Sequence, residues 1–307
     1  ALHVPVLLFA TKEPAAVDGQ RQSDSYCGTL AISAALHRRK ITFRFGGLVF
    51  PEEDVFAHEM STFLRACAAV RAVCGARLGQ LGLRPAQFES VVYDETAIMR
   101  KFGQSVVTRD LGDLAVVADA MEETDPELAR TVGEIGSGVG HCEASESYLE
   151  RLARVECAIL KFCEHEGITG LGVRCWPTIR KVLGVNACAL LGRLTEKGIP
   201  AACESDVVGA VSMLITYNSA LRETVPHFVD WTIRHREDPN CLLAWHCGNA
   251  PACLAADPGA SRLTDWGNYE FQVKPGPVTL SRLINYGEEW KLLVTAGEAV
   301  TEVGSEG

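Results

Sequence analysis

The chain has 307 residues, of which 47% are hydrophobic and 22% are charged, as in ordinary globular proteins. Its formal net charge is −10 and no basic stripe is present, which excludes nucleic acid as an expected partner. No apolar run approaches the roughly 20 residues that span a bilayer, so no membrane partner is expected. The 12 cysteines lie within apolar segments, where free thiols pack as small hydrophobes, and this predicts a reducing, cytoplasmic location.

The first part of the chain alternates between strand-like and helix-like segments. Residues 4–9 (VPVLLF) predict a strand and not a signal peptide, residues 23–38 a helix, and residues 51–74 a long helix with acidic residues in its first turn. Further short strands are predicted in the segments ITFRFGGLVF, ARLGQLG, SVVYD and QSVVTRD. This alternation indicates a parallel open sheet, and we expect residues 1–140 to form a Rossmann-like α/β domain.

The second part begins with a helical region, residues 111–165, and then returns to an α/β pattern at residues 167–175 (GITGLGVRC). After about residue 225, short extended segments alternate with Gly, Pro and Asn turns, which is typical of an antiparallel sheet or barrel. We therefore expect an α/β fold throughout. Residues 141–307 should form a C-terminal domain that ends in an antiparallel, β-barrel-like part.

Two motifs suggest familiar sites but lack the required context. GEIGSGVG follows a helical segment, whereas a dinucleotide fingerprint follows a strand, so we interpret it as an interdomain loop. CLLAWHCGNAPAC spaces Cys241, Cys247 and Cys253 six residues apart, whereas zinc ligands favour spacings of two to four.

The stretch GIPAACESDVVGAVSML (198–214) runs from a buried strand into a helix and holds two acids at the junction. Asp206 stands in the first turn of the predicted helix, where an acid stabilises the helix dipole. Glu204 stands at the carboxyl end of the strand, where α/β sheets gather their ligands. The sequence therefore predicts a capping role for Asp206 and a functional role for Glu204.

Glu204 forms a candidate set with Asp230, in HFVDW, and His246, in LLAWHCGN. Two carboxylates and an imidazole suit a divalent ion such as Mn²⁺ or Mg²⁺. The alternatives are a first-turn helix acid, a turn aspartate and a hydrogen-bonded core histidine, and spacing alone leaves them open.

Several motifs resemble the L-fucose/L-arabinose isomerase family: GLGVRCWPTI (170–179), GRLTEKGIPAACESDVVGAVSML (192–214), HFVDW (227–231) and LLAWHCGNAP (242–251). These resemble the family's C-terminal catalytic region. VPVLLFATKE and RLGQLG resemble its middle domain, so that the likeness covers most of the chain.

The resemblance implies a metal-dependent aldose–ketose isomerase that acts on a pentose, a 6-deoxyhexose or a related sugar. It implies Mn²⁺, or Mg²⁺ or Co²⁺, held by Glu204 and Asp230, with His246 as a ligand or substrate contact. It also implies a homo-oligomer, a trimer or hexamer, with active sites near subunit boundaries. Family chains carry a further α/β domain at the start and a metal-binding histidine near the end. The sequence shows no counterpart of that domain ahead of Ala1 and no histidine after His246, so we expect either a fragment of a longer chain or a member that has lost these parts.

Isomerisation moves a proton between C1 and C2 of the open-chain sugar through an enediol, and a divalent ion stabilises the charge on the sugar oxygens. Glu204 and Asp230 are the candidate acid/base pair. The candidate substrate contacts are Trp176, Trp231, Arg174, Gln20, Arg21 and Asn249. Two alternatives remain open: a non-catalytic sugar-binding or assembly protein of the same fold, and a metal-dependent epimerase or aldolase.

Overall fold

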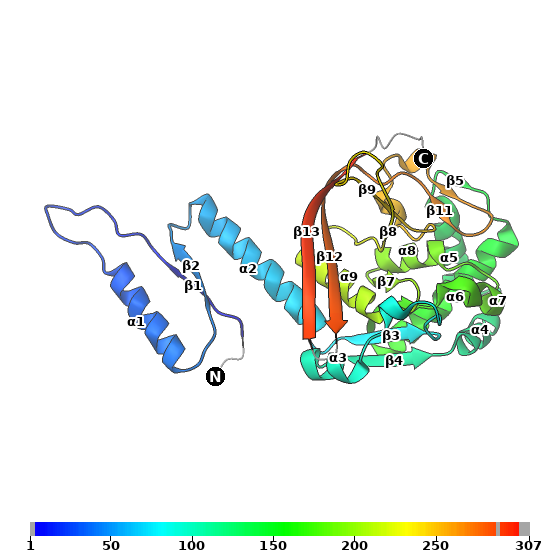
Figure 1. Ribbon diagram of the computed structural model, residues 1–307, viewed down its shortest axis with the longest axis horizontal. Coiled ribbons are helices and arrows are strands. Elements are labelled where there is room, and N and C mark those ends of the chain that lie inside the picture. Colours follow the sequence, from blue (N-terminus) through cyan, green and yellow to red (C-terminus); the bar gives the residue numbers. More distant parts are fainter. Residues whose placement is uncertain (1–3, 287–288, 301–307) are drawn as a thin grey trace. The chain divides into compact units, whose positions relative to one another are not determined.

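The computed structural model describes residues 4–286 and 289–300, and the chain divides into two compact units, residues 1–71 and 72–307. The first unit is a small βαβ arrangement (Figure 1). Strand β1 (Leu7–Ala10) pairs in parallel with β2 (Arg44–Leu48), and α1 (Ser25–Arg38) connects them. Helix α2 (Asp54–Val73) follows, so the helices predicted at 23–38 and 51–74 are confirmed.

The second unit is built on a four-stranded sheet in the order β4–β3–β6–β7, with every pair parallel. Its strands are β3 (Arg77–Leu81), β4 (Ser105–Arg109), β6 (Ile168–Val173) and β7 (Ala201–Ala202). The predicted parallel α/β sheet is therefore confirmed. The strand predicted in SVVYD is wrong, because residues Glu89–Val91 form a single 3-10 turn.

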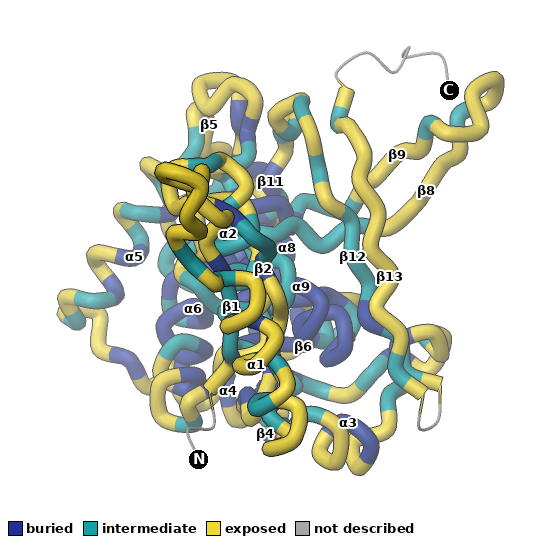
Figure 2. Tube along the Cα trace, turned by 90° about the vertical axis from the view of Figure 1, so that its left-hand side faces the viewer, coloured by how far each residue is buried: buried dark blue, intermediate teal, exposed yellow. Residues whose placement is uncertain are grey.

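Besides a small cluster of Ala202, Ala210 and Met213, the helices that pack against this sheet form two extensive hydrophobic clusters. The larger cluster joins β6 to α4 (Leu111–Asp119), α5 (Pro126–Ser137), α6 (Glu146–Glu166), the one-turn α7 (Arg180–Leu183) and α8 (Cys188–Glu196). The smaller joins β3 to α3 (Glu95–Phe102) and α9 (Val207–Ser219). In Figure 2 the buried residues concentrate along α6, α8, α9 and β6.

Two glycines on β6 allow the segment before α9 to lie directly on the sheet. A Cβ at Gly172 would come within 2.9 Å of the backbone of Ser205 and Val207, and one at Gly170 within 3.1 Å of Leu214. Only glycine leaves room for such close contact. The start of α9, and with it the turn that carries Glu204, is thereby held against the centre of the sheet.

A buried ion pair links α6 to α8. Arg193 donates from Nε to Glu156 at 2.6 Å and from Nη2 to the other carboxylate oxygen at 3.0 Å. Arg193 is 6% exposed and Glu156 is fully buried. A bidentate geometry of this kind compensates much of the cost of burying both charges.

The last third of the chain is antiparallel, apart from one parallel pair, β5–β10. Strands β8 (Asp230–Arg234) and β9 (Leu242–Trp245) form one ribbon, and β12 (Gly276–Tyr286) and β13 (Glu289–Ala299) form another. The short strands β5 (His141–Cys142), β10 (Arg262–Leu263) and β11 (Tyr269–Glu270) make a three-stranded sheet. Antiparallel strands after residue 225 are thus confirmed. Within the described residues they form separate small sheets, and a closed barrel stays a prediction.

The domain division predicted near residue 140 also stays a prediction. Strands from both sides of it, β3 and β4 before and β6 and β7 after, belong to the same sheet. No helix in the described part of the chain is long and apolar enough to cross a membrane.

Candidate metal centre

Glu204 lies in a tight turn between β7 and α9. Glu204 and Ser205 both have left-handed backbones, with φ of 64° and 59°, which is unusual for two consecutive residues that are not glycine. The amide of Ser205 donates to the carbonyl of Val173 at 3.0 Å, and its hydroxyl donates to the carbonyl of Gly82 at 3.1 Å. These bonds fix the turn at the carboxyl ends of β6 and β3, the edge of the sheet where α/β proteins gather ligands.

Asp206 has a different role from Glu204. Its Oδ1 accepts a hydrogen bond of 2.7 Å from the amide of Gly209, and its Oδ2 pairs with Arg282 on β12. Asp206 is 1% exposed, so its charge is compensated within the protein. The prediction that Asp206 caps the helix is confirmed.

Asp230 and His246 come together through the β8–β9 ribbon. Asp230, the first residue of β8, is paired with Trp245, the last residue of β9, so the next residue, His246, lies beside it. Oδ2 of Asp230 is 3.9 Å from Nε2 of His246. One ligand atom from each of Glu204, Asp230 and His246 lies within 4.8 Å of the other two. Among the residues that the structure describes, this is the one cluster of His, Cys, Asp or Glu with such spacing.

Only one of the two ring nitrogens of His246, Nδ1, has hydrogen-bond partners among the described residues. Nδ1 accepts a hydrogen bond of 3.0 Å from the amide of Cys247, and the sulfurs of Cys247 and Cys203 lie 3.4 Å and 3.8 Å from the same nitrogen. Nε2 is buried and has no hydrogen-bond partner. A buried polar atom without a partner is costly, and here it faces two carboxylates, which is the arrangement that a bound cation would satisfy.

The electrostatics also favour a cation. Burial, together with the nearby charge of Asp230, raises the pKa of Glu204 to about 7. Burial lowers the pKa of His246, but the hydrogen bond to Cys247 and the charges of Cys247, Asp230 and Cys175 together outweigh burial, so the net effect is a raised pKa. Two acids that repel each other in a partly buried place gain most from a positive charge between them.

A layer of cysteines lies behind the histidine. Sγ of Cys247 is 3.5 Å from Sγ of Cys188 at the start of α8, and Cys203 directly precedes Glu204. The contacts with Cys188 and His246 lower the pKa of Cys247, and the same pairing raises the pKa of Cys188. Each of the twelve cysteines is a free thiol. Cys188, Cys203 and Cys247 stand on three separate segments, so no local sequence pattern indicated this layer.

The predicted substrate contacts are placed in different ways. Trp176 follows β6 and is 66% exposed, and Trp231 follows Asp230 on β8 and is 54% exposed. Arg174 donates from Nη1 to the carbonyl of Leu83 at 2.7 Å, while its Nε is buried without a partner. All three belong to segments that carry or adjoin the cluster.

Asn249, Gln20 and Arg21 stand apart from this pattern. Asn249 is 4% exposed, and its amide makes hydrogen bonds only within the protein. Gln20 and Arg21 lie in an exposed loop of the first unit, where Arg21 pairs with Asp24 at 2.8 Å. Gln20 and Arg21 belong to the first compact unit and Glu204 to the second, so their role as substrate contacts stays a prediction.

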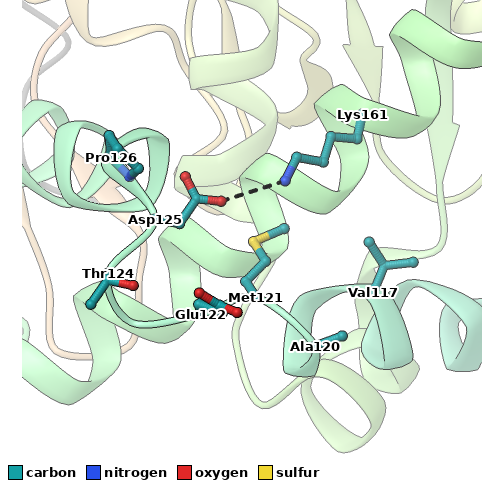
Figure 3. Close-up of a pocket in the computed structure, with 8 residues that line it drawn as sticks. All are labelled: Val117, Ala120, Met121, Glu122, Thr124, Asp125, Pro126 and Lys161. Atoms are coloured by element: carbon teal, nitrogen blue, oxygen red, sulfur yellow. Dashed lines mark ion pairs between the residues drawn. The ribbon is translucent and has the colours of Figure 1, made fainter.

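A separate cavity of about 500 Å³ lies beside the loop that joins α4 to α5 (Figure 3). Met121, Asp125 and Lys161 are among its lining residues, with Nζ of Lys161 3.8 Å from Oδ2 of Asp125. None of the candidate site residues lines it. We therefore do not assign it to the metal centre.

Comparison with known proteins gives consistent results along the chain. Residues 1–74 match the family model for the N-terminal domain of fucose/sulfoquinovose isomerase, where the sequence alone indicated the middle domain. The chain is 31% identical to the sulfoquinovose isomerase of Alkalicoccus urumqiensis over 307 residues, which cover 97% of this chain and 67% of that protein.

Two other sulfoquinovose isomerases are similar. The protein of Clostridium sp. (strain MSTE9) is 28% identical over 263 residues, 83% of this chain and 57% of its own length. That of Priestia aryabhattai is 25% identical over 308 residues, 96% of this chain and 66% of its own length. The chain thus spans about two thirds or less of the length of these relatives. It belongs to the fucose/sulfoquinovose isomerase family, whose members are sugar aldose–ketose isomerases.

Proposed function

We propose that this chain provides the metal centre of an aldose–ketose isomerase, and that Glu204, Asp230 and His246 hold a divalent ion, Mn²⁺ or alternatively Mg²⁺ or Co²⁺. The observation that carries the proposal is the buried Nε2 of His246, which has no partner and faces the two carboxylates. Family membership supports the reaction class.

The residues present fit such an ion. Oxygen and imidazole ligands suit Mn²⁺ and Mg²⁺. Three ligand atoms spaced evenly around an ion at about 2.2 Å are about 3.8 Å apart, and Oδ2 of Asp230 and Nε2 of His246 are already 3.9 Å apart, with a ligand atom of Glu204 within 4.8 Å of both residues' ligand atoms. Nε2 offers its lone pair to an ion only when the ring proton sits on Nδ1. In that tautomer Nδ1 no longer accepts from the amide of Cys247 and donates instead to Sγ of Cys247 at 3.4 Å.

When bound, the ion supplies Lewis-acid stabilisation of the negative charge that develops on the sugar oxygens. The protein's own acids then move the proton between C1 and C2. Glu204 and Asp230 are the two acids placed beside the ion to take and return it. Asp230, whose side chain is 56% exposed, is the second acid and stands beside Trp231, whose ring can bind the sugar's apolar face.

For the substrate we propose a pentose, a 6-deoxyhexose or a related aldose. The three relatives named above are sulfoquinovose isomerases, so sulfoquinovose is the first sugar to test. We further propose a cytoplasmic homo-oligomer, a trimer or hexamer. The free thiols support the location. The exposed apolar side chains of the β8–β9 ribbon, Trp231, Ile233 and Trp245, support association.

The test is to strip the protein with a chelator, add back Mn²⁺, and assay ketose formation from sulfoquinovose, L-fucose and L-arabinose. We expect at least one of these sugars to be converted to its ketose. This activity should require the metal and should be lost in Glu204→Gln. Sugar binding without any ketose would favour the non-catalytic alternative, and a product cleaved or inverted at one carbon would favour an aldolase or epimerase.

A further inference from the structure

We infer that Asn249 is a positioning residue that joins the three segments carrying Glu204, Asp230 and His246. Its amide contacts Cys203, next to Glu204, and Phe228, two residues before Asp230. Asn249 itself stands three positions after His246 in the chain. This inference rests on the proposed function, because it concerns the geometry of the same centre.

The first two contacts come from the amide nitrogen. Nδ2 of Asn249 lies 3.4 Å from Sγ of Cys203, the residue directly before Glu204. The same nitrogen donates to the carbonyl of Phe228 at 3.1 Å, two residues before Asp230. One NH₂ group, which has two protons to donate, thus connects the Glu204 turn to the segment that enters β8.

The third contact uses the amide oxygen. Oδ1 of Asn249 accepts from Nε2 of His227 at 3.2 Å. His227 precedes Phe228, so this second bond holds the same segment from another point. Because a side-chain amide donates and accepts at once, an asparagine can make all three contacts, whereas aspartate lacks the donor and alanine lacks both.

Burial distinguishes this role from a sugar contact. Asn249 is 4% exposed, and both ends of its amide are used inside the protein. A side chain that must reach a sugar needs a free donor or acceptor at the surface of the site. The contacts therefore favour positioning over the substrate contact expected for Asn249 from the sequence.

The experiment compares Asn249→Ala and Asn249→Asp with Asn218→Ala, all in the full chain. Asn218 is a matched control: it is 5% exposed, its Nδ2 donates to the carbonyl of Leu214, and its Oδ1 accepts from Arg222. Asn249→Asp keeps the shape and the acceptor for His227 but removes the donor. Each metal-free variant is titrated with Co²⁺ without sugar, followed by visible absorption, and its unfolding is measured in urea.

We expect both Asn249 variants to bind Co²⁺ about 10- to 100-fold more weakly, the range for outer-shell partners of metal ligands. Asn218→Ala should lower stability but keep Co²⁺ affinity within about threefold. Wild-type affinity in both Asn249 variants would overturn the inference, as would a rise in sugar KM with unchanged Co²⁺ affinity, which marks a substrate contact. If the wild-type protein bound no Co²⁺, the proposed function itself would fail and the inference with it.

Discussion

Oδ2 of Asp230 lies 3.9 Å from Nε2 of His246, although 16 positions separate the two residues in the chain. The pairing of Asp230 with Trp245 across the β8–β9 ribbon produces this proximity, since it places the ends of both strands side by side. The nitrogen of that pair is buried without a hydrogen bond, and Glu204 completes the cluster from a different part of the fold.

Asp230→Asn should abolish most metal binding without disturbing the fold. The side chain is 56% exposed, so its replacement should change the free energy of unfolding by no more than about 0.5 kcal/mol. The loss of a charged ligand should weaken Co²⁺ binding by more than about 100-fold, beyond the range for outer-shell residues. Asp238→Asn, at an exposed turn beyond β8, is the control and should bind Co²⁺ normally. Equal binding by both variants would remove Asp230 from the centre.

Glu204→Gly should stabilise the metal-free protein while it destroys metal binding. Glu204 has a φ of 64°, which glycine adopts without strain, and its carboxyl group is partly buried with a raised pKa. We expect the free energy of unfolding to rise by about 1 kcal/mol. Urea unfolding of the chelator-treated protein measures this change. Glu237→Gly, at an exposed site with negative φ, should be slightly destabilising, and a similar loss in Glu204→Gly would show that the turn stores no strain.

Removing one member of the buried pair of Glu156 and Arg193 should destabilise the protein far more than removing both. Among the residues that the structure describes, Glu156→Gln leaves the Arg193 guanidinium with the half-exposed Glu134 at 3.3 Å as its charged partner. We expect a loss of about 3 kcal/mol in urea unfolding. The double variant Glu156→Leu, Arg193→Met should recover much of it, because it removes both charges. Glu127→Gln, in the exposed pair with Arg130, should cost less than about 0.5 kcal/mol. A double variant as unstable as the single one would contradict this account.

His227 should make the metal-free protein sensitive to mild acid. Burial lowers its pKa from 6.5 to about 4, so the folded state holds the imidazole neutral while the unfolded chain protonates it. The stability is therefore complete above pH 6.5 and is lost as the pH falls toward 4. Between pH 7.5 and pH 5 this group should cost about 2 kcal/mol. Replacing it in His227→Gln should flatten that slope, whereas His165→Gln, whose side chain is 82% exposed, should not. Parallel pH profiles for wild type and His227→Gln would refute the assignment.

Parts of this site follow from local sequence patterns. The helix start at Val207 and its Asp206 cap are set by neighbouring residues, and both were predictable. Glu204 could be singled out because a strand end and a helix start meet at one carboxylate. In the same way, the apolar runs of β3, β4 and β6 indicated a parallel sheet, and the sheet is present.

The rest depends on contacts between distant segments, which no local pattern encodes. Cys188 meets Cys247 across 59 positions, and Asn249 reaches Cys203 across 46. In the sequence these cysteines cannot be told apart from small hydrophobic residues of the core. Asn249 likewise cannot be told apart from a surface amide that contacts a ligand. Gln20 and Arg21 lie on the loop after β1, in the first compact unit, and their role as substrate contacts stays a prediction.

The most direct test of the central claim is anomalous diffraction from crystals of the protein soaked in Mn²⁺. The account predicts one strong peak within about 2.0–2.6 Å of a carboxylate oxygen of Glu204, a carboxylate oxygen of Asp230 and Nε2 of His246. A peak elsewhere, for example at the sulfurs of Cys188 and Cys247, or no peak at this cluster at saturating Mn²⁺, would contradict it.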